Sequence, residues 1–198
     1  MSAEPEPRAG AASGPRIAAA IAALLVVLVT VYAHRDTLTL PLLGWDTWPL
    51  LATSRVTSLG ELGALLGREW LGGLYPDGVF WRPLTSLVVA LDVALHDGDA
   101  RGNPVVDLAL LALAAALAFS LARAVGGGRS ASSPRLVLGA VVAGLLFALH
   151  PAAAEVVVIP ARRGDLLWIA CALAAVLALD RASPGRPAWL AGVFATLA

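Results

Sequence analysis

Long apolar runs alternate with short polar segments along most of the chain. Four runs rich in Ala, Leu and Val cover residues 17–33, 105–125, 136–154 and 166–179, and a fifth, 187–198, is cut off at the end of the sequence. An α-helix rises about 1.5 Å per residue, so roughly 20 apolar residues cross the hydrocarbon core of a bilayer. The pattern predicts an all-α, polytopic transmembrane protein, with 17–198 as the N-terminal part of a larger membrane domain.

The segment before the first run has a different character. Residues 1–16 carry proline, glycine and charged residues without apolar periodicity, which predicts a disordered cytoplasmic tail. The run 17–33 also admits a second interpretation, a cleaved signal peptide ending at Val31-Tyr32-Ala33. Because the run is longer than a usual signal-peptide core and further apolar runs follow it, we expect a retained membrane span.

The distribution of arginine predicts the orientation in the membrane. Cytoplasmic loops retain positive charge. If the N-terminus is inside and residues 34–104 form an outer loop, the inner and outer segments hold equal numbers of arginines, but the inner segments have about half the length. The arginine density therefore favours a cytoplasmic N-terminus, with 150–165 outside and 126–135 inside.

Two amphipathic stretches lie in the predicted outer loop. Residues 83–95 are too short to cross a bilayer and contain Asp92, so we expect a juxtamembrane helix lying in the interface. Its apolar stripe comprises Leu84, Leu87, Val88, Leu91 and Leu95. Residues 57–71 have a similar pattern and begin with a capping box formed by Ser58 and Glu61. A Gly-rich turn over 72–78 is predicted to separate the two helices.

Composition excludes several classes of protein. The chain of 198 residues is 59% apolar and 14% charged, and its 14 basic residues, all arginine, balance 14 acidic ones. Soluble domains have about 25% charged residues, so the lipid bilayer is the expected surrounding. Zero net charge gives no reason to expect a nucleic-acid partner. The single cysteine, Cys171, excludes an intrachain disulfide and a cysteine-based metal site.

Two features of the outer loop are candidates for chemistry. Asp46 lies between Trp45 and Trp48, and tryptophans anchor a segment at headgroup depth. An acid there can serve as a general base or ligate a divalent metal, although it can equally be a solvated loop residue. Arg82 precedes Pro83 at a helix start, where its guanidinium suits a phosphate. Ordinary lipid headgroups would satisfy the same arginine.

A third feature follows the run that ends near residue 154. His150, Glu155, Arg163 and Asp165 gather at the outer face that is also predicted to hold Asp46. Ionisable groups beside apolar runs are costly and tend to face cavities, which makes this segment a candidate site. The alternative is an arginine–carboxylate pair that neutralises a tight loop. Asp107 is explained more simply, by the preference of acids for helix N-termini.

These motifs resemble a known family. Phe80-Trp81-Arg82-Pro83-Leu84, the stretch from Leu146 to Glu155 with its His150-Pro151 pair, and Arg163-Gly164-Asp165-Leu166-Leu167 follow an early acid in the outer loop. This order resembles the N-terminal half of integral-membrane GT-C glycosyltransferases. The most similar members are protein O-mannosyltransferases of the transmembrane-and-tetratricopeptide-repeat type and their bacterial relatives. The resemblance covers residues 17–180.

The resemblance implies a function and a set of roles. Such enzymes move a sugar from a polyprenyl-phosphate-linked donor to a protein or glycan acceptor, here on the outer face of a bacterial inner membrane. By resemblance, Asp46, Glu155 and Asp165 would be catalytic, and Arg82, His150 and Arg163 would bind substrate. Asp46 would also be the candidate ligand for a divalent metal ion, the one cofactor implied. The family often has paired acids in the first loop, whereas Thr47 follows Asp46 here.

Two other classes of protein remain as alternatives. A polytopic transporter would use intramembrane acids with arginine partners and would have a second, repeated half. A non-catalytic membrane scaffold would need none of the acids. Substituting Asp46 would leave the function of a scaffold intact. In the C-terminal sequence, further spans with a soluble repeat array would favour the transferase, and an inverted repeat would favour the transporter.

Overall fold

The computed structural model describes residues 14–71, 80–96, 102–127 and 133–181. Within these ranges every regular element is a helix, which confirms the all-α prediction. The elements are α1 (Gly14–Ala33), η1 (Arg35–Thr39), α2 (Thr47–Thr53), α3 (Leu59–Gly67), α4 (Pro83–His96), α5 (Gly102–Gly127), α6 (Pro134–Ala148), α7 (Pro151–Val157), η2 (Pro160–Arg162) and α8 (Arg163–Arg181). Most of the predicted tail (1–13), the turn at 72–78 and the run 187–198 lie outside the described residues.

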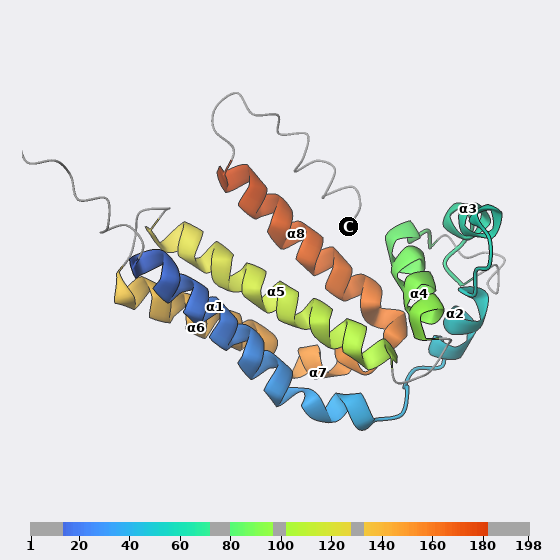
Figure 1. The fold of residues 1–198 in the computed structure, drawn as a ribbon, viewed down its shortest axis with the longest axis horizontal. Helices are drawn as coiled ribbons and strands as arrows, with labels where there is room; N and C mark the ends of the chain where they lie inside the picture. The colour runs from blue at the N-terminus through green and yellow to red at the C-terminus, as the bar shows by residue number, and fades with distance from the viewer. Residues whose placement is uncertain (1–13, 72–79, 97–101, 128–132, 182–198) are drawn as a thin grey trace, which may run out of the picture.

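The long helices form a bundle with α5 at its centre. Helix α5 packs against α1, α6 and α8, as Figure 1 shows. The contact between α1, α5 and α6 is made by small buried side chains around one phenylalanine: Ala22, Val26, Ala115, Phe119, Ala140 and Ala148. Small residues let helix backbones approach closely, which is how helices associate in an apolar surrounding.

Two helices are long and apolar enough to cross a membrane. They span Arg16–Ala33 in α1 and Pro104–Gly126 in α5, and both match predicted runs. A third candidate is α6 together with α7, but the pair bends by 55° where His150 and Pro151 interrupt the predicted run 136–154. Helix α8 contains the fourth predicted run, 166–179. It carries charged residues at both of its ends and is not among the candidate spans. The chain therefore has two or three candidate spans among its described residues.

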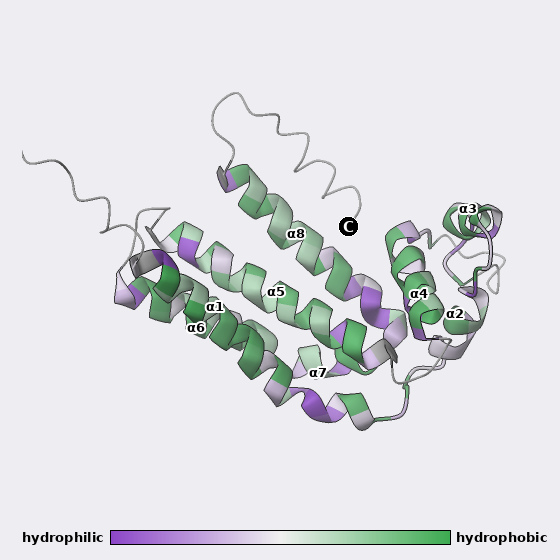
Figure 2. Cartoon of the chain, viewed as in Figure 1, coloured by the Kyte–Doolittle hydropathy of each residue, from purple (hydrophilic) through white to green (hydrophobic). Residues whose placement is uncertain are grey.

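The outer surface of the bundle is apolar. Ile17, Ile21, Leu24 and Leu28 on α1 are all more than half exposed. Hydropathy colouring shows the same apolar character along α1 and α6 in Figure 2. An apolar surface of this extent is unfavourable in water and suits contact with lipid.

Helices α2, α3 and α4 lie together at one end of the bundle (Figure 1). In α4 the predicted leucine stripe faces outward, with Leu91 53% and Leu95 77% exposed. The opposite face is buried and mixed, since it holds Thr85, Ser86 and Asp92 together with Val89, Ala90 and Val93. This helix therefore carries polar groups into the interior while part of its leucine stripe is exposed, as a helix beside lipid can.

Helix α3 begins as predicted but ends earlier, at Gly67. The Ser58 hydroxyl oxygen accepts the Glu61 N–H at 3.2 Å, which confirms the capping box. The Glu61 carboxylate in turn accepts from the Thr57 N–H at 2.7 Å and from the Thr57 hydroxyl at 2.9 Å. These hydrogen bonds, that from the Thr57 backbone first, lower the pKa of Glu61.

Candidate functional site

A cavity of about 390 Å³ opens at the end of the bundle where α8 begins. Three stretches of chain far apart in sequence contribute its walls. The lining residues are Gly44, Trp45, Asp46, Trp70, Phe80, Arg82, Ile159, Ala161, Arg162 and Asp165. The cavity thus combines two carboxylates and two guanidinium groups with aromatic walls, and its volume is in the range usual for small-molecule sites.

A tight turn before α2 places Asp46 at this cavity. Gly44 has a φ of +90°, and a side chain there would bring Cβ within 2.8 Å of the Ile159 side chain. The turn is tied to the far segment because the Leu43 N–H donates to the Val158 carbonyl oxygen at 3.3 Å. The position therefore requires glycine both for its backbone angle and for its close approach to Ile159.

The Asp46 carboxylate makes no capping bond although Asp46 stands at the N-cap of α2. Its Oδ1 atom is buried and has no hydrogen-bond partner among the described residues. Buried polar atoms are nearly always paired, so an unpaired carboxylate oxygen on a cavity wall is a candidate for binding or proton transfer.

Arg82 is held by aromatic rings. Its guanidinium lies 4.8 Å from the centre of the Trp70 ring and 5.7 Å from that of Phe80. The backbone N–H of Trp70 donates to the Phe80 carbonyl oxygen at 2.9 Å, which joins the two segments that carry these rings. In the described part of the chain no carboxylate lies within ion-pair distance of Arg82. Stacking leaves the edge of the guanidinium open to an anion.

Arg162 was not singled out from the sequence, yet it lines the cavity. Its Nη2 atom lies 3.0 Å from Glu155 Oε1, and both side chains are about half exposed. Glu155 does not line the cavity, but its carboxylate forms an ion pair with Arg162, which does. Asp165, in the first turn of α8, is exposed and lines the cavity. Which of the two neighbouring arginines, Arg162 or Arg163, lines the cavity depends on the residue at which α8 begins.

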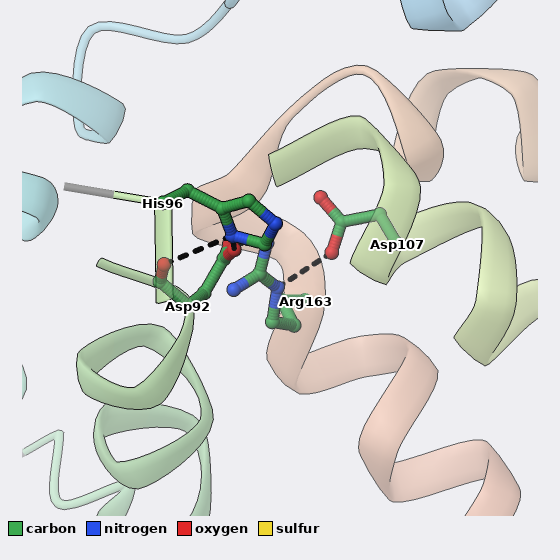
Figure 3. A network of polar contacts seen from close by, with 4 residues as sticks. All are labelled: Asp92, His96, Asp107 and Arg163. Atoms are coloured by element: carbon green, nitrogen blue, oxygen red, sulfur yellow. Dashed lines mark hydrogen bonds and ion pairs between the residues drawn. The ribbon is translucent and has the colours of Figure 1, made fainter. Parts of the chain in front are cut away.

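Arg163 does not line the cavity and is completely buried. Its Nη2 lies 2.9 Å from Asp92 Oδ2, and its Nε donates to Asp107 Oδ1 at 2.6 Å. His96 completes the group, since its Nδ1 donates to Asp92 Oδ1 at 2.8 Å. Figure 3 shows Arg163 between Asp92 and Asp107. Asp107 is therefore an ion-pair partner between helices as well as an acid near a helix start.

His150 lies at a different cavity, of about 310 Å³. It stands at the N-cap of α7, where its Nδ1 accepts the Ala152 N–H at 3.2 Å. The other lining residues are all apolar: Leu111, Leu146, Phe147, Ala152, Ala153, Val156, Leu166 and Ile169.

Of the six predicted site residues, three line the polar cavity: Asp46, Arg82 and Asp165. The other three, His150, Glu155 and Arg163, do not line it.

The described residues include no group of three or more His, Cys, Asp or Glu side chains that could hold a metal ion. The polar cavity itself offers two carboxylates with two arginines beside them. Positive guanidinium groups oppose cation binding, so this set of residues does not fit a metal centre.

The geometry defines a class of protein, a helical protein with two or three candidate membrane spans and a polar cavity at one end of its bundle. The chain is similar to Protein O-mannosyl-transferase Tmtc1 of Drosophila melanogaster, with 32% identity over 139 residues. The match covers 69% of this chain and 15% of that relative, so the chain spans a small part of the relative's length. No family model matches, and no solved structure does.

Proposed function

We propose that this protein is a membrane glycosyltransferase of the GT-C type. It would move a sugar from a polyprenyl-phosphate-linked donor to a protein or glycan acceptor at the outer face of the membrane. The transferase named in the Drosophila relative supports the reaction class. The observation that carries the proposal is the polar cavity, where Asp46, Arg82 and Asp165 meet between aromatic walls.

The donor phosphate would be bound by Arg82. Trp70 and Phe80 fix this guanidinium by stacking on it, so little side-chain entropy remains to be lost on binding. Arg162, held by Glu155, adds a second positive charge to the same cavity. Aromatic rings such as Trp45 offer flat apolar faces on which the sugar can pack.

Asp46 would act as the general base. The acceptor hydroxyl oxygen attacks the anomeric carbon while the bond from that carbon to the phosphate oxygen breaks. The hydroxyl proton passes to the Asp46 carboxylate, and the electron pair of the broken bond leaves with the phosphate, which Arg82 stabilises. A positioned base contributes about 10² to 10⁴ in rate. Asp165 stands on the same cavity and would orient the acceptor.

The proposed setting is a bacterial inner membrane with the N-terminus in the cytoplasm. This orientation rests on arginine density, which is higher in the segments assigned to the inside. The lipid bilayer would then be both the surrounding of α1 and α5 and the source of the donor. The cavity is lined by segments of the proposed outer loop and by residues 159–165, so a donor headgroup at the outer surface would be within its reach.

The Asp46→Asn variant tests the proposal, because it keeps the shape of the side chain and removes its charge. We expect normal insertion and a loss of sugar transfer of at least about a hundredfold. Transfer would be measured with the protein in lipid nanodiscs and a radiolabelled polyprenyl-phosphate sugar. Arg82→Lys is expected to give an intermediate loss, since lysine retains the charge but not the planar fork.

Asp36→Asn is the matched control, since Asp36 is an exposed outer-loop acid whose one ion-pair partner among the described residues is Arg35 at 3.6 Å. This control should transfer sugar at the wild-type rate. Near-wild-type transfer by Asp46→Asn would assign the base elsewhere and remove the role argued for the cavity.

A transporter is the second candidate, and one observation favours it. Asp92, Asp107 and Arg163 are buried ionisable groups between helices, as in many transport pathways. The sugar-transfer function is better supported, because Asp46 and Asp165 line a cavity whose wall also includes two arginines. Uptake of a solute into proteoliposomes that is abolished by Asp107→Asn and unaffected by Asp46→Asn would favour transport.

A further inference from the structure

The buried group around Arg163 joins three helices. Asp92 belongs to α4, Asp107 to α5, and Arg163 is the first residue of α8. The ion-pair distances are 2.9 Å to Asp92 and 2.6 Å to Asp107, and the side chains of all three residues are at most 1% exposed. The Asp107 contact is a hydrogen bond from Nε, and the Asp92 contact is an ion pair. Held on two sides by carboxylates of α4 and α5, the guanidinium restricts both the position and the rotation of the start of α8.

Stability alone does not account for this group. Removing charges from water is costly, and replacing a buried ion-pair network by apolar side chains of similar size often leaves a protein equally stable or more stable. Two carboxylates here face one guanidinium, with His96 hydrogen-bonded to Asp92 as the fourth ionisable member. What such a group can add is specificity of arrangement.

The residues on either side of Arg163 belong to the polar cavity. Arg162 and Asp165 line it, whereas Arg163 is absent from its wall and is fully buried. Gly164 lies directly against the site, because a Cβ there would come within 3.3 Å of Arg82 Nη1 and 2.9 Å of Thr85 Oγ1. A rotation of the start of α8 would therefore move Arg162 and Asp165 and disturb Arg82 at the same time.

We infer that Arg163 is a positioning residue that acts through α8. Held between Asp92 and Asp107, it sets the rotation of the first turn of α8 so that Arg162 and Asp165 reach the cavity and Gly164 meets Arg82. The side chain itself touches no substrate. As far as it concerns catalysis, this inference rests on the proposed transferase function, while the positioning of α8 can be measured independently.

The test compares variants of the protein in lipid nanodiscs by hydrogen exchange, thermal unfolding and transfer kinetics. One variant replaces the whole group by apolar residues, Asp92→Leu, Asp107→Leu and Arg163→Met together. We expect its unfolding temperature to stay close to that of the wild type, and amide exchange over residues 159–165 to rise by about tenfold. The kcat for sugar transfer should fall by a similar factor.

Arg163→Lys and Asp92→Asn are single variants that keep part of the group, and Arg135→Met, at an exposed arginine of α6, is the control. Compared with the triple apolar variant, Arg163→Lys should retain more protection of the amides from exchange and a higher kcat, because lysine keeps one positive charge between the two carboxylates. The control should match the wild type. If the apolar variant failed to fold, the two single variants would decide the question by their exchange over 159–165.

Unchanged exchange over 159–165 in the variants that fold would overturn the inference, as would a fall in unfolding temperature with kcat unchanged. Faster exchange together with a lower kcat would support it. Faster exchange in a protein whose wild-type form transfers no sugar would support the positioning of α8 and overturn the proposed function.

Discussion

The bundle of α1, α5 and α6 and the polar end built by α4 and the start of α8 are held together in different ways. In the bundle, alanines and Gly144 of α6 bring the helices close. The buried hydroxyl of Thr30 is satisfied within its own helix, since it donates to the Val26 carbonyl oxygen at 2.7 Å. At the polar end, apolar side chains also pack together, among them Val89 and Val93 of α4 with Ala161, and Leu108 of α5 with Leu166 of α8. Buried ion pairs between α4, α5 and α8 are added to this packing. The bundle depends on close packing, whereas the polar end combines apolar packing with buried charges.

The difference bears on where chemistry can take place. The cavity of about 310 Å³ beside α5 and α6 has apolar walls apart from His150, whereas the cavity of about 390 Å³ at the polar end has carboxylates on its wall. His34 marks the boundary, since its Nε2 contacts the carbonyl oxygen of Ala148 at 2.8 Å and so joins the ends of α1 and α6. Substitutions in the bundle should therefore act on stability, and substitutions at the polar end should act on binding and rate.

The largest effect is expected in the bundle, for Gly144→Leu. A Cβ at Gly144 would lie 3.1 Å from Val26 Cγ1 and 3.2 Å from both the Ala115 carbonyl oxygen and Phe119 Cβ. A leucine cannot fit there unless α1, α5 and α6 separate, and overpacking costs about 1–3 kcal/mol or more. We expect a markedly lower unfolding temperature, measured in detergent by circular dichroism. Gly139→Leu on the same helix is the control, because nothing lies within 4 Å of its Cβ position.

A wild-type unfolding temperature for Gly144→Leu would contradict the close packing described for the bundle. A large fall for Gly139→Leu as well would show that α6 responds to any added side chain, and the comparison between the two regions would lose its basis.

A smaller and different effect is expected at the polar end, for Gly164→Ala. The added methyl group would lie 2.9 Å from Thr85 Oγ1 and would press on Arg82. We expect unfolding to change little and sugar transfer to fall by about tenfold, because misplacing a binding group by a fraction of an ångström is enough to reduce the rate. Adding Thr85→Ala to the variant should recover part of the rate. Gly63→Ala in α3, where nothing lies within 4 Å, should behave as the wild type.

The smallest effect is expected for Glu61→Ala in α3. The pKa of Glu61 is lowered in the folded state by the Thr57 hydrogen bonds, so its carboxylate stabilises α3 above the ordinary pKa of glutamate. This contribution is lost as the pH falls through the lowered pKa. At neutral pH the variant should exchange the amides of 59–67 a few times faster than the wild type. At a pH below the lowered pKa the two should exchange alike, and a difference that persisted there would assign the effect to helix propensity.

The sequence by itself predicted the features that depend on near neighbours. Apolar runs of sufficient length predicted α1 and α5, since a single helix satisfies its own backbone in lipid. The capping box at Ser58 and Glu61 was predicted because its partners lie three residues apart. The family resemblance brought Asp46, Arg82 and Asp165 into one hypothesis, and all three line the polar cavity.

Only the tertiary structure decided which charges meet. Asp107 is 56 residues from Arg163 in sequence, and nothing in the local pattern of either segment indicates the other as its partner. The choice of Arg162 for the cavity and Arg163 for the interior depends on where α8 begins and how it is rotated against α4 and α5. A helix start can shift by a residue at little local cost, whereas a buried guanidinium requires its two carboxylates, so packing between helices fixed what the sequence alone left open.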